Sequence, residues 1–263
     1  MVHGIDERLL PMNIVLLQTD VAWADPIKNM EQARQLLSSA GEADLYVLPE
    51  MWATGFAVQP EGIAEEADTA RSLAWMRQLA RARRCAVCGS LAVRTPDGKF
   101  HNRHYFVTPD AVEYYDKRHL FTHGHEDEFF EAGDRQVVVC WKGFRFLLLT
   151  CYDLRFPVWS RWGRAGEYDA IILVANWPAS RQLAWDVLVR ARAIENQSYV
   201  IAVNRVGTDA AGIVYEGGSM AVDPIGRTIA AAEKNVEQAV CAMLDIDQLR
   251  KMRSHFRVLA DRD

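Results

Sequence analysis

Short apolar runs, separated by polar and turn-forming positions, recur along the chain and predict β-strands. Residues 170–175, Ala-Ile-Ile-Leu-Val-Ala, are typical of a strand buried on both faces. Other runs are bounded by turn signals such as Pro96-Asp97-Gly98 and Lys142-Gly143. The predicted strands are residues 13–19, 45–48, 85–93, 102–107, 112–115, 136–140, 145–150, 170–175, 199–203, 219–222, 227–231 and 238–244.

Longer segments with apolar residues at helical spacing predict helices between these strands. The first has a clear start and end, because Asp25 supplies an N-cap acceptor, Pro26 suits the first helical position, and Gly41 follows the last turn. The four predicted helices are residues 26–40, 69–84, 157–166 and 180–196.

Strands that alternate with helices predict an α/β protein in which helices cover the sheets. Several consecutive strands, such as residues 102–107 and 112–115, have no helix between them. Mixed sheets with hairpins are therefore expected, rather than a purely parallel sheet. Because no linker, repeat or low-complexity run divides the chain, we expect a single domain over residues 13–263 after an N-terminal extension, residues 1–12.

Composition excludes several classes of function. The 263 residues carry 30 Lys and Arg against 35 Asp and Glu, a net charge of −5, which gives no basic surface for nucleic acid. The longest apolar run is far shorter than the ~20 residues that span a bilayer. The N-terminus has no signal-peptide pattern, and the cysteine count of five is odd. Reduced thiols and a cytoplasmic location are therefore expected.

Three polar residues stand where apolar strands end: Glu50, Lys117 and Cys151. Any one of them alone would usually be a solvated charge or, for the cysteine, a buried apolar side chain. The carboxyl ends of strands in α/β sheets line ligand crevices, so the three together predict one site.

A carboxylate, an ammonium and a thiol form a coherent set for acyl transfer. The carboxylate can accept the thiol proton as general base and return it to a leaving amine. The ammonium lowers the thiol pKa and can stabilise the oxyanion of a tetrahedral intermediate, together with a backbone N–H beside the nucleophile. The set therefore predicts hydrolysis through a thioester.

Three segments resemble the catalytic motifs of the nitrilase superfamily, the carbon–nitrogen hydrolases, in the order that the family has them. They are Leu48-Pro-Glu-Met51, Tyr115-Asp-Lys-Arg-His-Leu120 and Cys151-Tyr-Asp-Leu-Arg-Phe-Pro157, within a resemblance that covers residues 13 to about 249. The resemblance implies that Glu50 is the general base, Lys117 the oxyanion stabiliser and Cys151 the nucleophile. It also implies a second glutamate between the lysine and the cysteine. Counting back from Gly133 favours Glu126 over Glu128 and Glu131, for orienting Lys117 or the substrate.

The segments Cys151-Tyr-Asp-Leu-Arg-Phe-Pro-Val-Trp-Ser-Arg161 and Ala175-Asn-Trp-Pro178 are most similar to the ω-amidase-like branch. This likeness implies hydrolysis of the terminal amide of small dicarboxylate monoamides, such as 2-oxoglutaramate or 2-oxosuccinamate, with release of ammonia. It implies a four-layer αββα sandwich of two mixed β-sheets flanked by helices, a homodimer or larger homo-oligomer, and neither metal nor organic cofactor. Nitrilase, carbamoylase or peptide-like amidase chemistry is the alternative within the superfamily.

Three further residues are candidates for substrate binding. Arg155 could bind the free carboxylate of a monoamide, or could pair with Asp153 in the core. Trp177 could form a wall of the pocket, or simply pack beside it. Tyr152 would supply the backbone N–H that shares the oxyanion with Lys117.

Other readings of the sequence remain open. Cys85 and Cys88 have the spacing of a redox pair, but a strand would place their side chains on opposite faces. A structural role is therefore expected for both. Cys140 and Cys241 are likewise expected to be structural residues in the core. A metal cluster of His119, His123 and His125 with nearby acids matches no strong metal motif. His119 could instead activate Cys151 in a Cys–His hydrolase. A non-catalytic protein that binds a metabolite is the remaining alternative.

Overall fold

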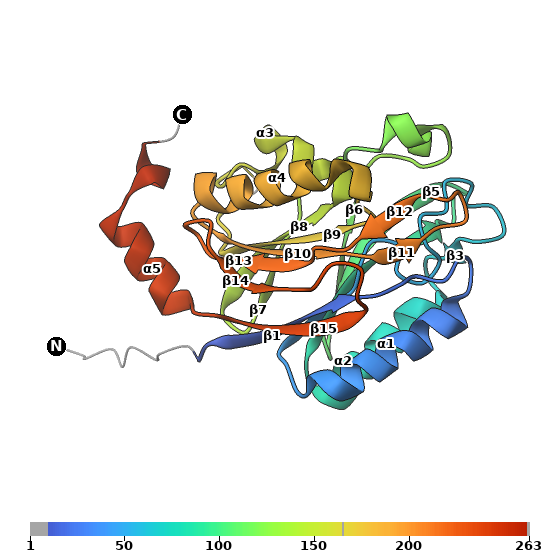
Figure 1. Cartoon of the computed structure of the whole chain (residues 1–263), viewed down its shortest axis with the longest axis horizontal. Helices are drawn as coiled ribbons and strands as arrows, with labels where there is room; N and C mark the ends of the chain where they lie inside the picture. Colours follow the sequence, from blue (N-terminus) through green and yellow to red (C-terminus); the bar gives the residue numbers. More distant parts are fainter. Residues whose placement is uncertain (1–9, 165, 262–263) are drawn as a thin grey trace.

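The computed structural model describes residues 10–164 and 166–261, and two mixed β-sheets form its centre (Figure 1). The first sheet has the order β15-β1-β2-β4-β5-β6, with β3 also paired to β4. Its strands are β1 (Met12–Gln18), β2 (Leu45–Val47), β3 (Glu65–Glu66), β4 (Ala86–Arg94), β5 (Phe100–Val107), β6 (Val112–Asp116) and β15 (Gln238–Leu244).

The second sheet has the order β14-β13-β10-β9-β8-β7, and a separate two-stranded hairpin joins β11 to β12. Parallel and antiparallel neighbours occur in both large sheets, as the missing helices between consecutive strands predicted. The strands are β7 (Val138–Trp141), β8 (Phe144–Thr150), β9 (Ala170–Ala175), β10 (Tyr199–Asn204), β11 (Val206–Thr208), β12 (Val214–Glu216), β13 (Met220–Val222) and β14 (Thr228–Ala231).

Helices cover the outer faces of both sheets (Figure 1). Helices α1 (Pro26–Ala40) and α2 (Arg71–Arg83) pack on the first sheet, and α4 (Gln182–Glu195) packs on the second beside the single turn α3 (Pro157–Ser160). Helix α5 (Ile246–His255) follows β15. No helix in the described part of the chain is long and apolar enough to span a bilayer.

Alternation along the strands divides the core into three apolar layers. In β8, Phe146 and Leu148 point into the layer between the two sheets, whereas Leu147 and Leu149 point toward α4. In β1, Leu16 lies in the same central layer as Phe146, and Val15 faces α1 and α2. The four-layer αββα sandwich implied by the family resemblance is therefore confirmed.

The structure corrects several details. The predicted helix over residues 157–166 is only the turn α3, because Arg161 is extended and the next backbone N–H, of Trp162, turns to donate to Asn196. Cys140 and Cys241 are exposed rather than in the core, because β7 and β15 are edge strands. The hairpin β11–β12 and helix α5 were not predicted. Most of the predicted extension, residues 1–9, lies outside the described residues.

Candidate active site

The three strand-end residues converge at one edge of the sandwich. Glu50 follows β2, Lys117 follows β6 and Cys151 follows β8, each at the carboxyl end of its strand. Glu126 lies in the short 3₁₀ helix η2 (Glu126–Glu128). Glu50, Lys117 and Glu126 are completely buried and Cys151 is 9% exposed, so the four groups are largely shielded from bulk water.

One ammonium lies between two carboxylates. Lys117 Nζ is 2.9 Å from Glu50 Oε1, and 3.1 and 2.8 Å from Glu126 Oε1 and Oε2. Asn102 Nδ2 donates to the same two carboxylates, at 2.7 Å to Glu50 Oε1 and 3.0 Å to Glu126 Oε1. We call Glu50, Asn102, Lys117 and Glu126 the floor of the site. Charge-assisted hydrogen bonds of this kind hold the floor in one geometry.

Asn176 ties Glu50 to the second sheet. Its backbone N–H donates to Glu50 Oε2 at 2.7 Å, and its side-chain Nδ2 donates to the Glu50 backbone carbonyl at 2.8 Å. Ser90 Oγ donates to Asn102 Oδ1 and accepts from Met51 N, which fixes both ends of the same network. Glu50 is therefore oriented from both sheets.

Cys151 begins the 3₁₀ helix η3 (Cys151–Arg155) with φ +45°, in the left-handed region that non-glycine residues seldom adopt. Such a conformation costs on the order of 1–3 kcal/mol and persists where the surroundings hold it. The Cys151 sulfur lies 3.8 Å from the carbonyl oxygen of Asn176. The turn thus presents the thiol beside the floor. Met51, next to Glu50, has φ +44°.

Burial dominates the electrostatics of these groups. It raises the pKa of the Cys151 thiol well above its ordinary value, and the charge of Glu50 adds to this rise while Lys117 opposes it. Burial alone would lower the pKa of Lys117, but the charges of Glu126 and Glu50 outweigh it and raise that pKa. Burial also raises the pKa of Glu126, against the opposing charge of Lys117. The resting site therefore holds a neutral thiol beside a charged lysine.

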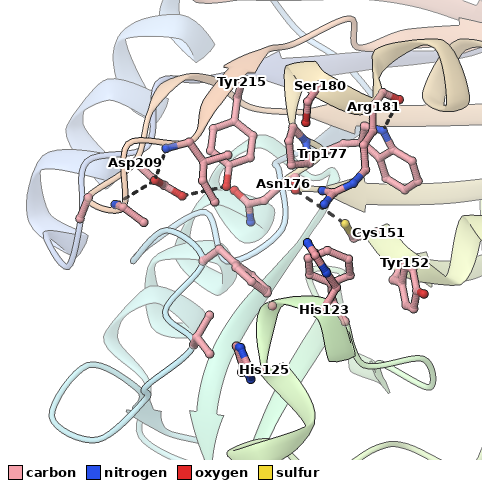
Figure 2. A pocket seen from close by; sticks show the side chains of 18 of the residues that line it. His123, His125, Cys151, Tyr152, Asn176, Trp177, Ser180, Arg181, Asp209 and Tyr215 are labelled. Carbon is pink, nitrogen blue, oxygen red and sulfur yellow. Dashed lines mark hydrogen bonds between the residues drawn. The ribbon is translucent and has the colours of Figure 1, made fainter.

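A cavity of about 900 Å³ opens over the thiol. Figure 2 shows Cys151 with Asn176 and Trp177 beside it, while Asp209 and Tyr215, around the β11–β12 hairpin, contribute another wall. Aromatic and aliphatic side chains form much of the lining: Trp23, Phe56, Val58, Phe121, Phe129 and Ile213. The volume lies within the range of small-molecule sites.

Two arginines line the cavity without a carboxylate partner among the described residues. The Arg155 guanidinium lies 5.0 Å from the centre of the Trp177 ring, and that of Arg181 lies 5.1 Å from the centre of the Phe121 ring. We call Arg155 and Arg181 the rim arginines. The core pairing of Arg155 with Asp153 that the sequence left open does not occur, because Asp153 accepts hydrogen bonds from other groups.

The acidic side chains of the lining are already engaged. Glu128 pairs with His125 at 2.7 Å, and Asp209 accepts from Tyr215 OH at 2.9 Å and from two backbone N–H groups. The rim arginines are therefore the charged groups of the lining that have room for a new partner. The cavity is suited to an anion.

Both aromatic candidates from the sequence lie at the cavity. Trp177 is 2% exposed and donates from Nε1 to the Arg181 carbonyl at 2.9 Å, so it both lines the cavity and packs beneath it. The Tyr152 ring lies 5.2 Å from the rings of both Phe121 and Phe156. Its backbone N–H belongs to the residue directly after Cys151, a common position for an oxyanion donor.

The histidine alternatives find no geometric support. His119 Nδ1 is bonded to Asp153 at 2.8 Å and its ring stacks on Phe156, so it does not serve Cys151. His125 pairs with Glu128. No group of three or more His, Cys, Asp or Glu residues within residues 10–164 and 166–261 is arranged to hold a metal ion.

The Cys-x-x-Cys spacing is structural. Cys85 packs between the first sheet and its helices, whereas Cys88 packs between the two sheets, so the side chains point to opposite faces as predicted. Cys88 Sγ contacts His104 Nε2 at 2.8 Å instead.

Three residues of the site were missed from the sequence: Asn102, Asn176 and Arg181. Asn176 directly follows β9, so the strand-end argument that found Cys151 could have found it as well. Asn102 lies within β5, and its neighbours in the sequence give no sign that it bridges two buried carboxylates.

Comparison with known proteins identifies the family of the chain. The family model for carbon–nitrogen hydrolases matches residues 13–254. The chain is 40% identical to Omega-amidase YafV of Escherichia coli, over 96% of this chain and 97% of that protein. It is 30% identical to 2-oxoglutaramate amidase of Bacillus subtilis, over 94% and 96%. The crystal structure of XC1258 from Xanthomonas campestris, a CN-hydrolase superfamily protein with an arsenic adduct in its active site, superposes with a TM-score of 0.92 at 38% identity, over 97% and 98% of the two chains.

The chain belongs to the carbon–nitrogen hydrolase family, as its three motifs predicted. Its fold, an α/β sandwich of mixed sheets, is that of the family. Family membership together with the amidase relatives makes it a hydrolase that acts on the C–N bond of linear amides.

Proposed function

We propose that this enzyme is an ω-amidase that hydrolyses the terminal amide of small dicarboxylate monoamides, of the 2-oxoglutaramate or 2-oxosuccinamate type, to the acid and ammonia. The observation that carries the proposal is the buried contact of Lys117 with Glu50 and Glu126, placed beside the Cys151 thiol at the base of an open cavity. The likeness to two amidases of this kind supports the choice of substrate.

In the acylation step, Cys151 attacks the amide carbonyl as its proton moves to Glu50. The raised pKa of the thiol keeps the proton on sulfur until substrate arrives, so a base must remove it during the attack. The oxyanion forms beside Lys117 and the Tyr152 backbone N–H, which replace water as preorganised donors. Glu50 then gives the proton to the leaving nitrogen, ammonia departs, and a thioester remains on Cys151.

In the deacylation step, Glu50 accepts a proton from a water molecule that attacks the thioester. The same oxyanion donors stabilise the second tetrahedral intermediate. Its collapse breaks the C–S bond, the sulfur recovers the proton from Glu50, and the dicarboxylic acid leaves. The proposed role of Glu126 is to hold Lys117 in place, because both of its carboxylate oxygens contact Nζ.

The free carboxylate of the substrate requires a cationic partner away from the thiol. Arg155 is our candidate for this role, with Arg181 available on the same lining. Trp177 packs against Arg155 and would limit where the guanidinium can lie. A monoamide that reacts at one end and is held by a charge at the other would be oriented for attack.

Ammonia release from a panel of amides tests the proposal. Purified enzyme should release ammonia from dicarboxylate monoamides and far less from neutral amides of equal length. Cys151→Ala should fold normally and release none, whereas the matched control Cys140→Ala, on an exposed edge strand, should keep full activity. Mass spectrometry should locate the acyl adduct on Cys151. An adduct on another cysteine, or a nitrile as the preferred substrate, would contradict the proposal.

We also propose a homo-oligomer that acts in the cytoplasm. Three apolar side chains on one side of α4, Leu183, Val187 and Ile194, are 78%, 55% and 52% exposed, which favours contact with a second copy. A free nucleophilic thiol suits a compartment that keeps cysteines reduced. Light scattering on the purified protein tests the first point, since a monomer at working concentration would contradict it.

A further inference from the structure

A buried carboxylate outside the floor joins the two chain segments that carry Lys117 and Cys151. Asp153 lies two residues after Cys151 in η3 and is completely buried. A buried carboxylate is retained only where several donors compensate for its lost hydration. The identity of those donors shows what Asp153 is for.

Each oxygen of Asp153 accepts two hydrogen bonds. Oδ1 accepts from the backbone N–H of His119 at 3.0 Å and lies 2.8 Å from Nδ1 of the same residue. Oδ2 accepts from Tyr115 OH at 2.7 Å and from the backbone N–H of Thr150 at 2.9 Å. Tyr115 and His119 stand two residues before and after Lys117, and Thr150 directly precedes Cys151. One carboxylate therefore bridges both segments.

Tyr115 extends this bridge. Its hydroxyl oxygen also accepts from the backbone N–H of Arg118 at 3.0 Å and from Nε1 of Trp159 at 3.1 Å. The two backbone N–H groups that follow Lys117, of Arg118 and His119, thus both donate to the cluster formed by Asp153 and Tyr115. The Lys117 segment cannot shift without breaking bonds to the turn that carries the thiol.

We propose that Asp153 is a positioning residue that sets the separation between the Lys117 ammonium and the Cys151 sulfur. It acts through the two backbone segments and touches neither the substrate nor the thiol. The left-handed φ of Cys151 makes such support necessary, because a strained turn relaxes unless neighbouring bonds hold it. The inference deepens the proposed amidase mechanism and rests on it for its kinetic readout.

Asp153→Asn is the variant that tests the inference. Asparagine keeps one acceptor oxygen and replaces the other with an NH₂ group that cannot accept. Either the His119 N–H, or the Tyr115 hydroxyl together with the Thr150 N–H, therefore loses its acceptor. Because small misplacements of catalytic groups can cost on the order of 100-fold in rate, kcat should fall by about that factor with little change in KM. Alkylation of Cys151 by iodoacetamide at neutral pH should also slow, since Lys117 no longer lowers the thiol pKa to the same extent.

Asp169→Asn is the matched control. Asp169 is also a buried carboxylate, 4% exposed, and it accepts from Arg145 N and Nε at 3.0 and 3.1 Å. It binds the start of β8, whereas Asp153 binds at the end of the same strand. The control should lower the thermal midpoint to a similar extent and leave both kcat and the alkylation rate unchanged.

Tyr115→Phe provides a second variant in case Asp153→Asn does not fold. It removes one donor to Asp153 and the acceptor of Arg118 N, and should lower kcat about tenfold in the same direction. Variants at Asp153 or Tyr115 that lose stability but keep wild-type kcat and alkylation rate would overturn the inference. If the wild-type enzyme releases no ammonia from any amide, the proposed function fails, and the alkylation rates still decide the role of Asp153.

Discussion

The floor of the site is buried and its charges face one another, whereas the rim arginines have no carboxylate partner in the described chain. Lys117 contacts both Glu50 and Glu126 within 3.1 Å, and Asn102 bridges the same carboxylates. The guanidinium of Arg155 lies against the Trp177 ring, and that of Arg181 lies against the Phe121 ring.

This difference separates chemistry from specificity. A buried network costs little reorganisation when charge develops on the substrate, so the floor suits bond breaking in any linear amide. Cations at the rim that have no carboxylate partner among the described residues can favour or disfavour one end of a particular substrate. Changes to the floor should therefore lower kcat for all substrates, and changes to the rim should alter KM for anionic substrates only.

Among variants that keep the nucleophile, the largest effect is expected at Glu50. Glu50→Gln keeps the shape of the side chain but removes the base, so kcat should fall by about 10³–10⁴-fold, the upper range for general acid–base catalysis. Steady-state ammonia release measures this, with a matched control in Glu128→Gln, an exposed cavity carboxylate that pairs with His125. Equal losses in the two variants would remove the distinction between the floor and the cavity lining.

Sequence patterns predict the floor better than the rim, for a physical reason. Glu50 and Lys117 of the floor each follow an apolar strand, as does Cys151 beside the floor, and strand periodicity is strong in a sandwich with three apolar layers. Asn102 was not found, because a polar residue inside a strand is ordinarily a solvated face, and only the tertiary structure brings two carboxylates to it.

The rim depends on short turns with weak sequence signals. Arg155 was singled out because it lies close to Cys151 in the sequence. Its alternative partner Asp153 could be excluded only from the structure, in which Tyr115 and His119 occupy the Asp153 carboxylate. Arg181 lies in the one-turn 3₁₀ helix η4 (Ala179–Arg181), and nothing in the sequence distinguishes it from a solvated arginine before α4.

The rim arginines should produce an intermediate effect that depends on substrate charge. Arg155→Leu should raise KM for a dicarboxylate monoamide by about 10–100-fold, the value of one charge-assisted hydrogen bond, with kcat nearly unchanged. Arg181→Leu should have a smaller effect in the same direction. Neither variant should change kcat/KM for a neutral amide of equal length.

Comparison of the two substrates in each variant provides the internal control. A parallel loss on the neutral amide would show that these arginines support the cavity rather than bind a carboxylate. If only Arg181→Leu raised KM for the dicarboxylate monoamide, Arg181 rather than Arg155 would be the residue that binds the substrate carboxylate.

Replacement of the buried His104 is expected to have the smallest effect on catalysis and a clear effect on stability. His104 is completely buried between Cys88 and the Leu149 carbonyl, and burial lowers its pKa from 6.5 to about 3. The unfolded chain takes up this proton from about pH 6.5 downward and the folded protein does not. The free energy of unfolding should therefore fall as pH drops from 6.5 toward 3, by roughly 5 kcal/mol at most over the whole window.

His104→Gln removes this proton linkage. Denaturant unfolding at pH 7, 5 and 4 should show a variant that is less stable than wild type at pH 7 and loses less stability on acidification. The control is His125→Gln, which replaces a side chain that is 69% exposed beside the cavity. Because the carboxylates of the protein are common to all three chains, the difference in slope isolates His104. Identical slopes for His104→Gln and wild type would show that the buried imidazole already takes up its proton in the folded state.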